Sequence, residues 1–65
     1  MIGYVKIEKC SRPRSWYESL VGQWYPVYAD EGIEWETYEL DGHKNYILKE
    51  DTTDEFTHVQ VTKEQ

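Results

Sequence analysis

The residues best suited to chemistry are acidic and lie close together in the middle of the chain. Six carboxylates occur from position 30 to position 41 with no Lys or Arg among them: Asp30, Glu31, Glu34, Glu36, Glu39 and Asp41. On a strand, Glu34 and Glu36 point to the same face about 7 Å apart. Like charges at this distance repel each other unless a nearby cation offsets the repulsion. Two interpretations stay open. The carboxylates are presented to an Arg- or Lys-lined groove, or they are a solvated hairpin that protects a sheet edge.

Catalysis by these carboxylates, or by the cysteine and the histidines, is disfavoured. A general acid needs a raised pKa, which requires burial in a cleft, and nothing around Glu34 and Glu36 indicates one. Cys10, His43 and His58 stand singly, without the paired spacing of metal ligands or a third residue to orient a Cys–His dyad. We therefore predict a non-enzymatic protein with no catalytic residue, no metal and no cofactor, in which Cys10 is a small buried hydrophobe.

Aromatic side chains are the second group with functional potential. The chain has three Trp, six Tyr and one Phe, and each such ring can bury about 150–250 Å². Tyr17 and Trp24 could belong to an exposed platform, because Trp and Tyr are favoured anchors of protein interfaces. Trp16 has two open interpretations, either part of that platform or a ring that closes the end of the core.

Short strands are needed to position these side chains. Period-two alternation and turn residues predict five of them, over residues 2–9, 24–29, 33–40, 44–48 and 56–61. In the second strand, Tyr25 and Val27 face one side, whereas Trp24, Pro26 and Tyr28 face the other. Pro26 lacks an amide hydrogen and so indicates an edge strand or a bulge.

Turn and helix signals separate the strands. Residues 30–32 and Asp41-Gly42 predict hairpin turns. Ser15 is expected to cap a helical turn over residues 16–19, and residues 49–54 suit a second turn before the last strand. These elements predict a small five-stranded SH3-like barrel, a single domain over residues 1–61 with a frayed tail over residues 62–65.

Composition limits the location and the partners. One cysteine permits no internal disulfide, and no apolar run resembles a leader or a membrane span. We therefore expect a cytoplasmic protein without a membrane partner. The net charge of −6 disfavours direct binding to nucleic acid and favours a partner protein with a basic surface. Opposite charges in the early loop and the acidic segment are compatible with a monomer or a weak homo-oligomer.

Several features, in their order along residues 5–51, resemble the small SH3-like barrel proteins of Gram-positive bacteria and their phages. They are Val5 and Ile7, Cys10-Ser11, Trp16-Tyr17, Val21-Gly22, Tyr25 and Val27, and Ile47-Leu48 followed by Asp51. The resemblance implies the barrel fold and, for a phage protein, an inhibitor of a host or defence protein. The Ala-Leu-Tyr-Asp-Tyr signature of signalling SH3 domains is missing, so recognition of Pro-rich peptides is not implied.

The leading hypothesis is a protein-binding module in which aromatic rings supply contact area and carboxylates supply steering. The predicted contact residues are Tyr17, Trp24, Glu34, Glu36, Tyr38, Glu39 and Asp41. One alternative is an acidic decoy that mimics nucleic acid and fills the basic channel of a DNA- or RNA-binding enzyme. Another is a regulatory barrel with a weak nucleic-acid role, which would use Lys6, Lys9, Arg12 and Arg14 as a basic patch.

Overall fold

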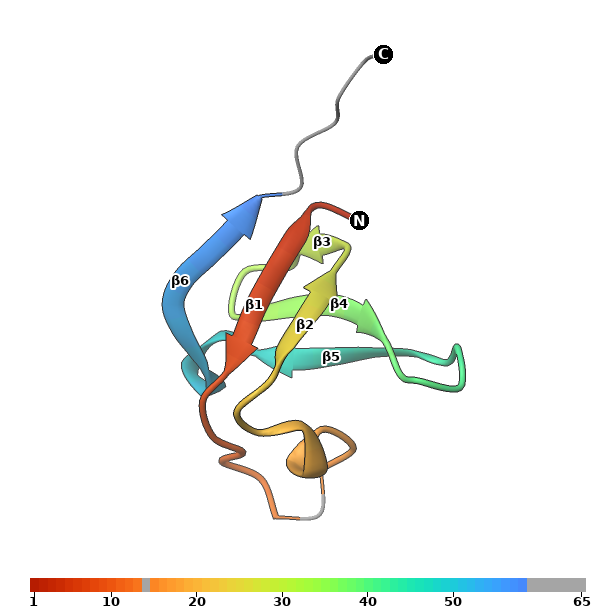
Figure 1. The fold of residues 1–65 in the computed structure, drawn as a ribbon. Coiled ribbons are helices and arrows are strands. Elements are labelled where there is room, and N and C mark those ends of the chain that lie inside the picture. The colour runs from red at the N-terminus through yellow and green to blue at the C-terminus, as the bar shows by residue number, and fades with distance from the viewer. Residues whose placement is uncertain (14, 59–65) are drawn as a thin grey trace.

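A computed structural model describes residues 1–13 and 15–58, the last five of these by their backbone alone. Over these residues the chain forms six strands and two 3-10 helices (Figure 1). In order they are β1 (Gly3–Ile7), η1 (Glu18–Leu20), β2 (Trp24–Val27), β3 (Ala29–Asp30), β4 (Glu34–Tyr38), β5 (Lys44–Leu48), η2 (Lys49–Asp51) and β6 (Thr52–His58). Neither helical turn, nor any other segment that the structure describes, forms an apolar helix of membrane-spanning length.

The strands form two antiparallel sheets of three strands each, ordered β2-β1-β6 and β3-β4-β5. The predicted all-β class is confirmed. The structure has six strands instead of five, because the segment predicted as one strand over residues 24–29 divides at Tyr28. Its first part, β2, pairs with β1, whereas its second part, β3, pairs with β4. Within residues 1–13 and 15–58, the pairings leave two separate sheets and no closed barrel.

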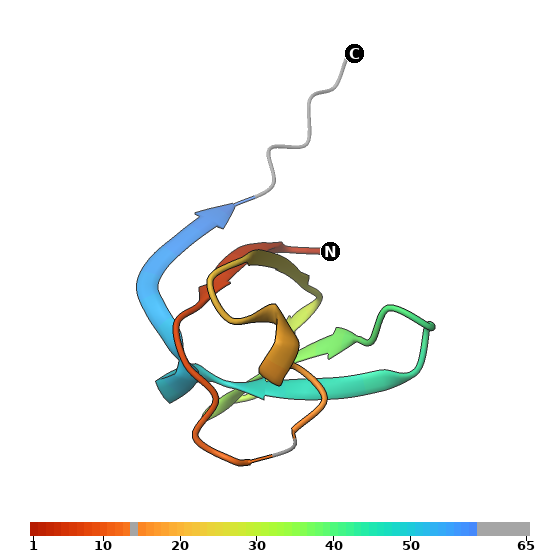
Figure 2. The same cartoon turned by 60° about the horizontal axis from the view of Figure 1, so that its bottom comes forward.

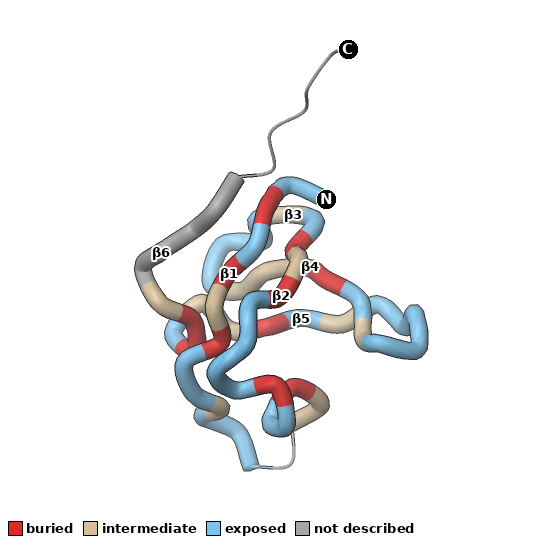
Figure 3. Tube along the Cα trace, viewed as in Figure 1, coloured by how far each residue is buried: buried red, intermediate tan, exposed pale blue. Residues whose placement is uncertain are grey.

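The core lies between the sheets and is built mainly from the inward sides of β1, β2, β4 and β5 (Figure 3). In β2, Tyr25 and Val27 are buried and Trp24 is exposed, as the alternation predicted. Pro26 lies opposite Tyr4 of β1, and β2 is an edge strand of its sheet, which accommodates the missing amide hydrogen. The other buried apolar side chains of the described residues come from β1 and β5 (Val5, Ile7 and Ile47) and from the long loop between β1 and β2 (Tyr17 and Leu20).

A polar contact joins the two sheets across this core. The Thr37 hydroxyl of β4 donates a hydrogen bond of 2.6 Å to the carbonyl oxygen of Pro26 in β2. Thr37 is fully buried, so this bond satisfies a hydroxyl that would otherwise lose its water contacts on folding. It also fixes how β4 sits relative to β2.

Both predicted hairpin turns are present. Gly32, between β3 and β4, has φ +84°, and Gly42, between β4 and β5, has φ +97°. These are backbone conformations that L side chains rarely adopt, so glycine is favoured at both turns. Each turn is also tied by an aspartate, since Asp30 accepts from the Gly32 amide and Asp41 from the His43 amide, both at 3.0 Å.

The helical turns differ in detail from the predictions. The first is displaced to η1, and Ser15 contributes its carbonyl oxygen, which accepts from the Glu18 amide at 3.1 Å, without a side-chain cap. The long loop that carries η1 hangs below β1 and β2 in Figure 1 and comes toward the viewer in Figure 2. The second turn is η2, and β6 starts at Thr52, earlier than predicted. The predicted strand end at 59–61 and the tail at 62–65 lie outside the described residues.

Candidate protein-binding surface

Aromatic rings gather on the outer side of β1 and β2. Val5, Tyr25 and Val27 are buried, and the residue next to each in the chain is exposed: Tyr4, Trp24 and Tyr28. Tyr4 lies opposite Pro26, two places along from the pair formed by Lys6 and Trp24 and therefore on the same face. Directly opposed and diagonal residues on one face of a sheet are within reach of large side chains, so these residues form one continuous surface.

A fourth ring from the other sheet extends this surface. The ring centroids of Tyr28 and Tyr38 are 5.0 Å apart, with an edge-to-face angle of 89°. The Tyr28 amide donates to the Glu36 carbonyl at 2.8 Å, which holds this corner of the chain against β4. We call the combined surface the aromatic face and define it as Tyr4, Trp24, Pro26, Tyr28 and Tyr38.

The rings of the aromatic face are substantially exposed. The exposed fractions are 37% for Tyr4, 44% for Trp24, 38% for Tyr28 and 37% for Tyr38. Trp24 and Tyr38 were predicted as contact residues, whereas Tyr4 and Tyr28 were not. The alternation that places Val5 and Ile7 inside would have placed Tyr4 outside beside Trp24, so the signal for Tyr4 was present.

Tyr17 does not contribute to a binding surface, and its predicted exposure is wrong. Its side chain is only 2% exposed. The ring packs into the core cluster with Ile7, Tyr25 and Ile47, and its hydroxyl donates a hydrogen bond to the Asp51 carboxylate. A ring with one polar atom can be buried when that atom finds an acceptor, and Asp51 is that acceptor.

Asp51 was noted in the sequence only as part of the family resemblance, and it is fully buried. Its carboxylate accepts from the Tyr17 hydroxyl, from the Ser11 amide at 3.1 Å and from the Ser11 hydroxyl at 3.1 Å. Its backbone carbonyl accepts from the amides of Glu8 at 2.7 Å and Lys9 at 3.1 Å. One residue of η2 therefore holds both branches of the long loop between β1 and β2.

These contacts change the acidity of both partners. Burial alone would raise the pKa of Asp51, but the hydrogen bonds from Tyr17 and Ser11 outweigh it, and the pKa lies below its usual value. Burial, followed by the hydrogen bond to the carboxylate, raises the pKa of Tyr17. At neutral pH the pair is therefore an ionised carboxylate and a protonated phenol, as a structural anchor requires.

The lowered pKa of Asp51 predicts a loss of stability in acid. The unfolded chain takes up this proton near the ordinary aspartate pKa of about 3.9, before the folded protein does, so the contribution is complete above that pH and is lost as the pH falls through the folded pKa. Urea unfolding between about pH 6 and pH 3 should show a steeper decline for the wild type than for Asp51→Asn. Equal slopes would contradict this assignment.

Trp16 belongs mainly to the core. The half-buried indole packs edge-on against Tyr17 and Tyr25, each at 5.5 Å between centroids. Its Nε1–H donates to the Tyr46 carbonyl of β5 at 2.9 Å. Trp16 thus fastens the long loop to the second sheet. The part of the ring that remains accessible faces the β4–β5 turn.

The six acidic residues between positions 30 and 41 do not form one compact cluster in the structure. Asp30 and Glu31 lie at the β3–β4 turn, Glu34 and Glu36 lie on β4, and Glu39 and Asp41 lie at its far end. Strand β4 separates the two turns, so the acidic groups are spread along its length.

Four of these acidic side chains have partners within the chain. Lys49 Nζ lies 2.6 Å from the Asp30 carboxylate, and Lys44 Nζ lies 3.5 Å from Glu36. Asn45 donates to Glu39 at 2.8 Å, and the His43 ring nitrogen lies 2.9 Å from Asp41. The repulsion between Glu34 and Glu36, which suggested a cationic partner, is therefore offset by Lys44 within the protein.

The remaining polar candidates are dispersed. Cys10 is half-buried against the core, and its thiol donates to the Arg12 carbonyl at 3.0 Å. Lys6 lies on the outer side of β1 opposite Trp24. Arg14 and the His58 side chain, which the basic-patch and dyad hypotheses invoke, lie outside the described residues. In the part that the structure describes, no three His, Cys, Asp or Glu side chains form a group able to hold a metal ion.

No protein-family model, curated protein or solved structure matches this chain.

Proposed function

We propose that this chain is a non-enzymatic protein-binding module that acts by covering a surface of its partner with the aromatic face. The observation that carries the proposal is that four Tyr and Trp rings are substantially exposed, with Tyr4 and Trp24 diagonal to one another across β1 and β2 and Tyr28 in edge-to-face contact with Tyr38. Such rings bury a large area with few torsions to immobilise and keep a polar atom for hydrogen bonding, which is why they dominate binding energy at interfaces. A contiguous exposed apolar patch on a small domain is typical of an interaction site.

We also propose that the fold is a small SH3-like barrel. Strands β2 and β3 follow one another in the chain but belong to different sheets, and a strand that bends from one sheet into the next is how packed sheets form a corner. The long loop after β1 and the helical turn η2 before β6 are also features of the predicted barrel. The two proposals are compatible, since the aromatic face covers this corner.

Charge narrows the class of partner. The net charge of −6 favours association with a basic protein surface, because long-range attraction raises the rate of encounter. If the chain is phage-encoded, as the resemblance implies, the partner would be a host or defence protein. The nucleic-acid decoy has less support, because Lys44 and Lys49 neutralise part of the acidic segment within the chain.

The test is the effect of Trp24→Ser on partner capture. The wild-type domain is immobilised, exposed to lysate of the organism that carries the gene, and the retained proteins are quantified by mass spectrometry. A partner identified in this way should bind the variant about 30-fold more weakly by calorimetry, because loss of a central aromatic anchor costs about 2 kcal/mol. Undiminished affinity would remove the aromatic face from the binding site.

The matched control is Tyr46→Ser. Tyr46 is 38% exposed, as Tyr28 is, but it lies on β5 outside the aromatic face. This variant should retain the partner, and a loss equal to that of Trp24→Ser would indicate a nonspecific effect of removing a ring. Duplex DNA added at low salt tests the decoy hypothesis. If the domain is a decoy, DNA competes for the basic channel of the partner and releases the domain from it.

A further inference from the structure

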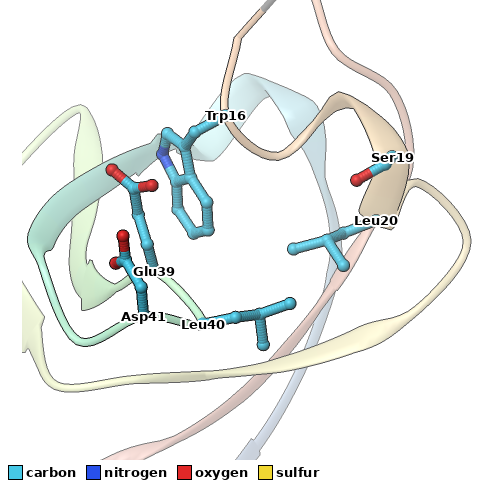
Figure 4. A pocket seen from close by; sticks show the side chains of 6 residues that line it. All are labelled: Trp16, Ser19, Leu20, Glu39, Leu40 and Asp41. Carbon is cyan, nitrogen blue, oxygen red and sulfur yellow. The ribbon is translucent and has the colours of Figure 1, made fainter.

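A pocket of about 220 Å³ lies between the long loop and the β4–β5 turn (Figure 4). Trp16, Ser19 and Leu20 line it from the loop, and Glu39, Leu40 and Asp41 line it from the turn. The volume is several times the roughly 30 Å³ that one water molecule occupies in the liquid, so a long side chain has room to enter.

One side of the pocket is apolar and is formed by Trp16, Leu20 and Leu40. In Figure 4 the Trp16 indole stands between the two carboxylates and Leu20, and Leu40 extends beneath it toward Leu20. Leu40 is 83% exposed, although it borders a ring and a second leucine. An aliphatic stem placed among these side chains would cover apolar surface that now contacts water.

The other side of the pocket is negatively charged. Figure 4 shows the carboxylates of Glu39 and Asp41 next to each other on one side of the indole. Hydrogen bonds from the backbone amide of His43, and then from its ring, hold the pKa of Asp41 below its usual value, so this carboxylate is ionised at neutral pH.

Neither carboxylate is saturated by its neighbours. Among the described side chains, Asn45 donates to Glu39 Oε2 at 2.8 Å, and Oε1 has no hydrogen-bond donor among them. Asp41 is held by His43 on both oxygens, but each carboxylate oxygen can accept more than one hydrogen bond. The pocket thus combines an apolar side, an aromatic ring and two acceptors, and none of the described residues that line it is Lys or Arg.

We propose that this pocket receives an arginine side chain of the partner. The inference rests on the proposed protein-binding function and specifies the chemistry that the partner must present. An arginine stem packs along leucines, its planar guanidinium lies against an indole, and its fork of N–H donors matches carboxylates; the compact ammonium of lysine matches this combination less well.

The position of the pocket agrees with that of the aromatic face. Tyr38 ends the aromatic face, and Glu39 and Leu40 follow it directly in the chain. Successive Cα atoms are about 3.8 Å apart. A partner segment that runs from Tyr38 over the β4–β5 turn would therefore reach the pocket with an arginine side chain.

The experiment titrates the whole domain with Nα-acetyl-arginine methylamide while NMR follows the Trp16 indole N–H and the Leu40 methyl groups. The comparison probe is the citrulline derivative, which has nearly the same shape without the charge. We expect saturable shifts with arginine in the millimolar range of Kd, and binding by citrulline at least tenfold weaker. Equal binding by both probes, or no saturable shift with arginine, would overturn the proposal.

Two variants locate the effect. Glu39→Gln with Asp41→Asn should weaken arginine binding at least tenfold, because both carboxylates lose their charge. The matched control is Glu31→Gln with Glu34→Gln, which removes the same charge at the opposite end of β4 and should leave binding unchanged. Equal weakening in both double variants would assign the effect to net charge and reject the pocket. A failed pocket test with partner binding still sensitive to Trp24→Ser would reject the pocket alone.

Discussion

Replacing Asp51 by alanine is expected to remove a large share of the free energy of unfolding of the domain. The substitution removes the acceptor of the Tyr17 hydroxyl and of the Ser11 amide and hydroxyl. A hydrogen bond to a charged group contributes about 1.5–3 kcal/mol, and a donor left buried without a partner costs a similar amount. We expect a loss of about 3 kcal/mol or more, against a total of roughly 3–10 kcal/mol for a chain of this length.

Urea unfolding followed by tryptophan fluorescence and circular dichroism measures this loss. Tyr17→Phe removes one of the hydrogen bonds and keeps the ring, so its cost should be about 1–2 kcal/mol, well below that of Asp51→Ala. Glu50→Ala is the control, since Glu50 is adjacent and exposed, and its effect should stay within about 0.5 kcal/mol. If Asp51→Ala were no more destabilising than Glu50→Ala, Asp51 would not be the anchor of the long loop.

The second large effect is expected at Trp16. Trp16→Ala removes a ring that packs against Tyr17 and Tyr25 and a hydrogen bond to β5. Truncation of a large ring in a core costs about 3–5 kcal/mol, and half-burial places this site near 3 kcal/mol. For a domain of this size the melting temperature should fall by on the order of 15 °C. Trp16→Phe, which keeps a ring but loses the N–H, should recover much of that loss.

Trp24→Ala is the informative comparison for Trp16. Trp24 is exposed on the aromatic face, so its removal should change the melting temperature by only a few degrees, about the effect of an ordinary surface substitution. A drop as large as that of Trp16→Ala would mean that Trp24 supports the fold, and it would weaken the argument that its exposure serves a partner.

Local patterns were sufficient for the strands and turns. The strand predicted over residues 44–48 has those bounds in the structure, and Gly32 and Gly42 lie in the predicted turns. The inward positions of Val5 and Val27 follow from alternation, because a strand with one buried face repeats every second residue. These features depend on neighbours only a few positions away, so one sequence reveals them.

Contacts between distant segments were not predictable in this way. Ser11 and Asp51 are 40 positions apart, and nothing local to either residue indicates that they meet. The burial of Tyr17 depends on that meeting, because its hydroxyl needs the Asp51 carboxylate as an acceptor. The division of the second strand at Tyr28 likewise depends on β3 pairing with β4. Each is a tertiary effect that overrides the local preference.

The candidate surface was predictable in part for the same reason. Trp24 was recognised because its strand alternates clearly, and it lies on the aromatic face. The six acidic residues are close in sequence, which favours interpreting them as one group. The β4 strand distributes them over two turns, and the hairpin register brings Lys44 near Glu36. The sequence therefore suggests a larger cluster of free carboxylates than the structure presents on one surface.

The corner at Tyr28 has a mechanical consequence. Tyr4 and Trp24 belong to one sheet and Tyr38 to the other, and the edge-to-face contact between Tyr28 and Tyr38 lies where the two sheets meet. A macromolecule seated on all of these rings would act as a clamp, because separating the sheets would require its release. Binding of the partner to the aromatic face would then raise the free energy of opening of both sheets. The backbone amides of the two sheets would exchange with solvent more slowly, and by a similar factor.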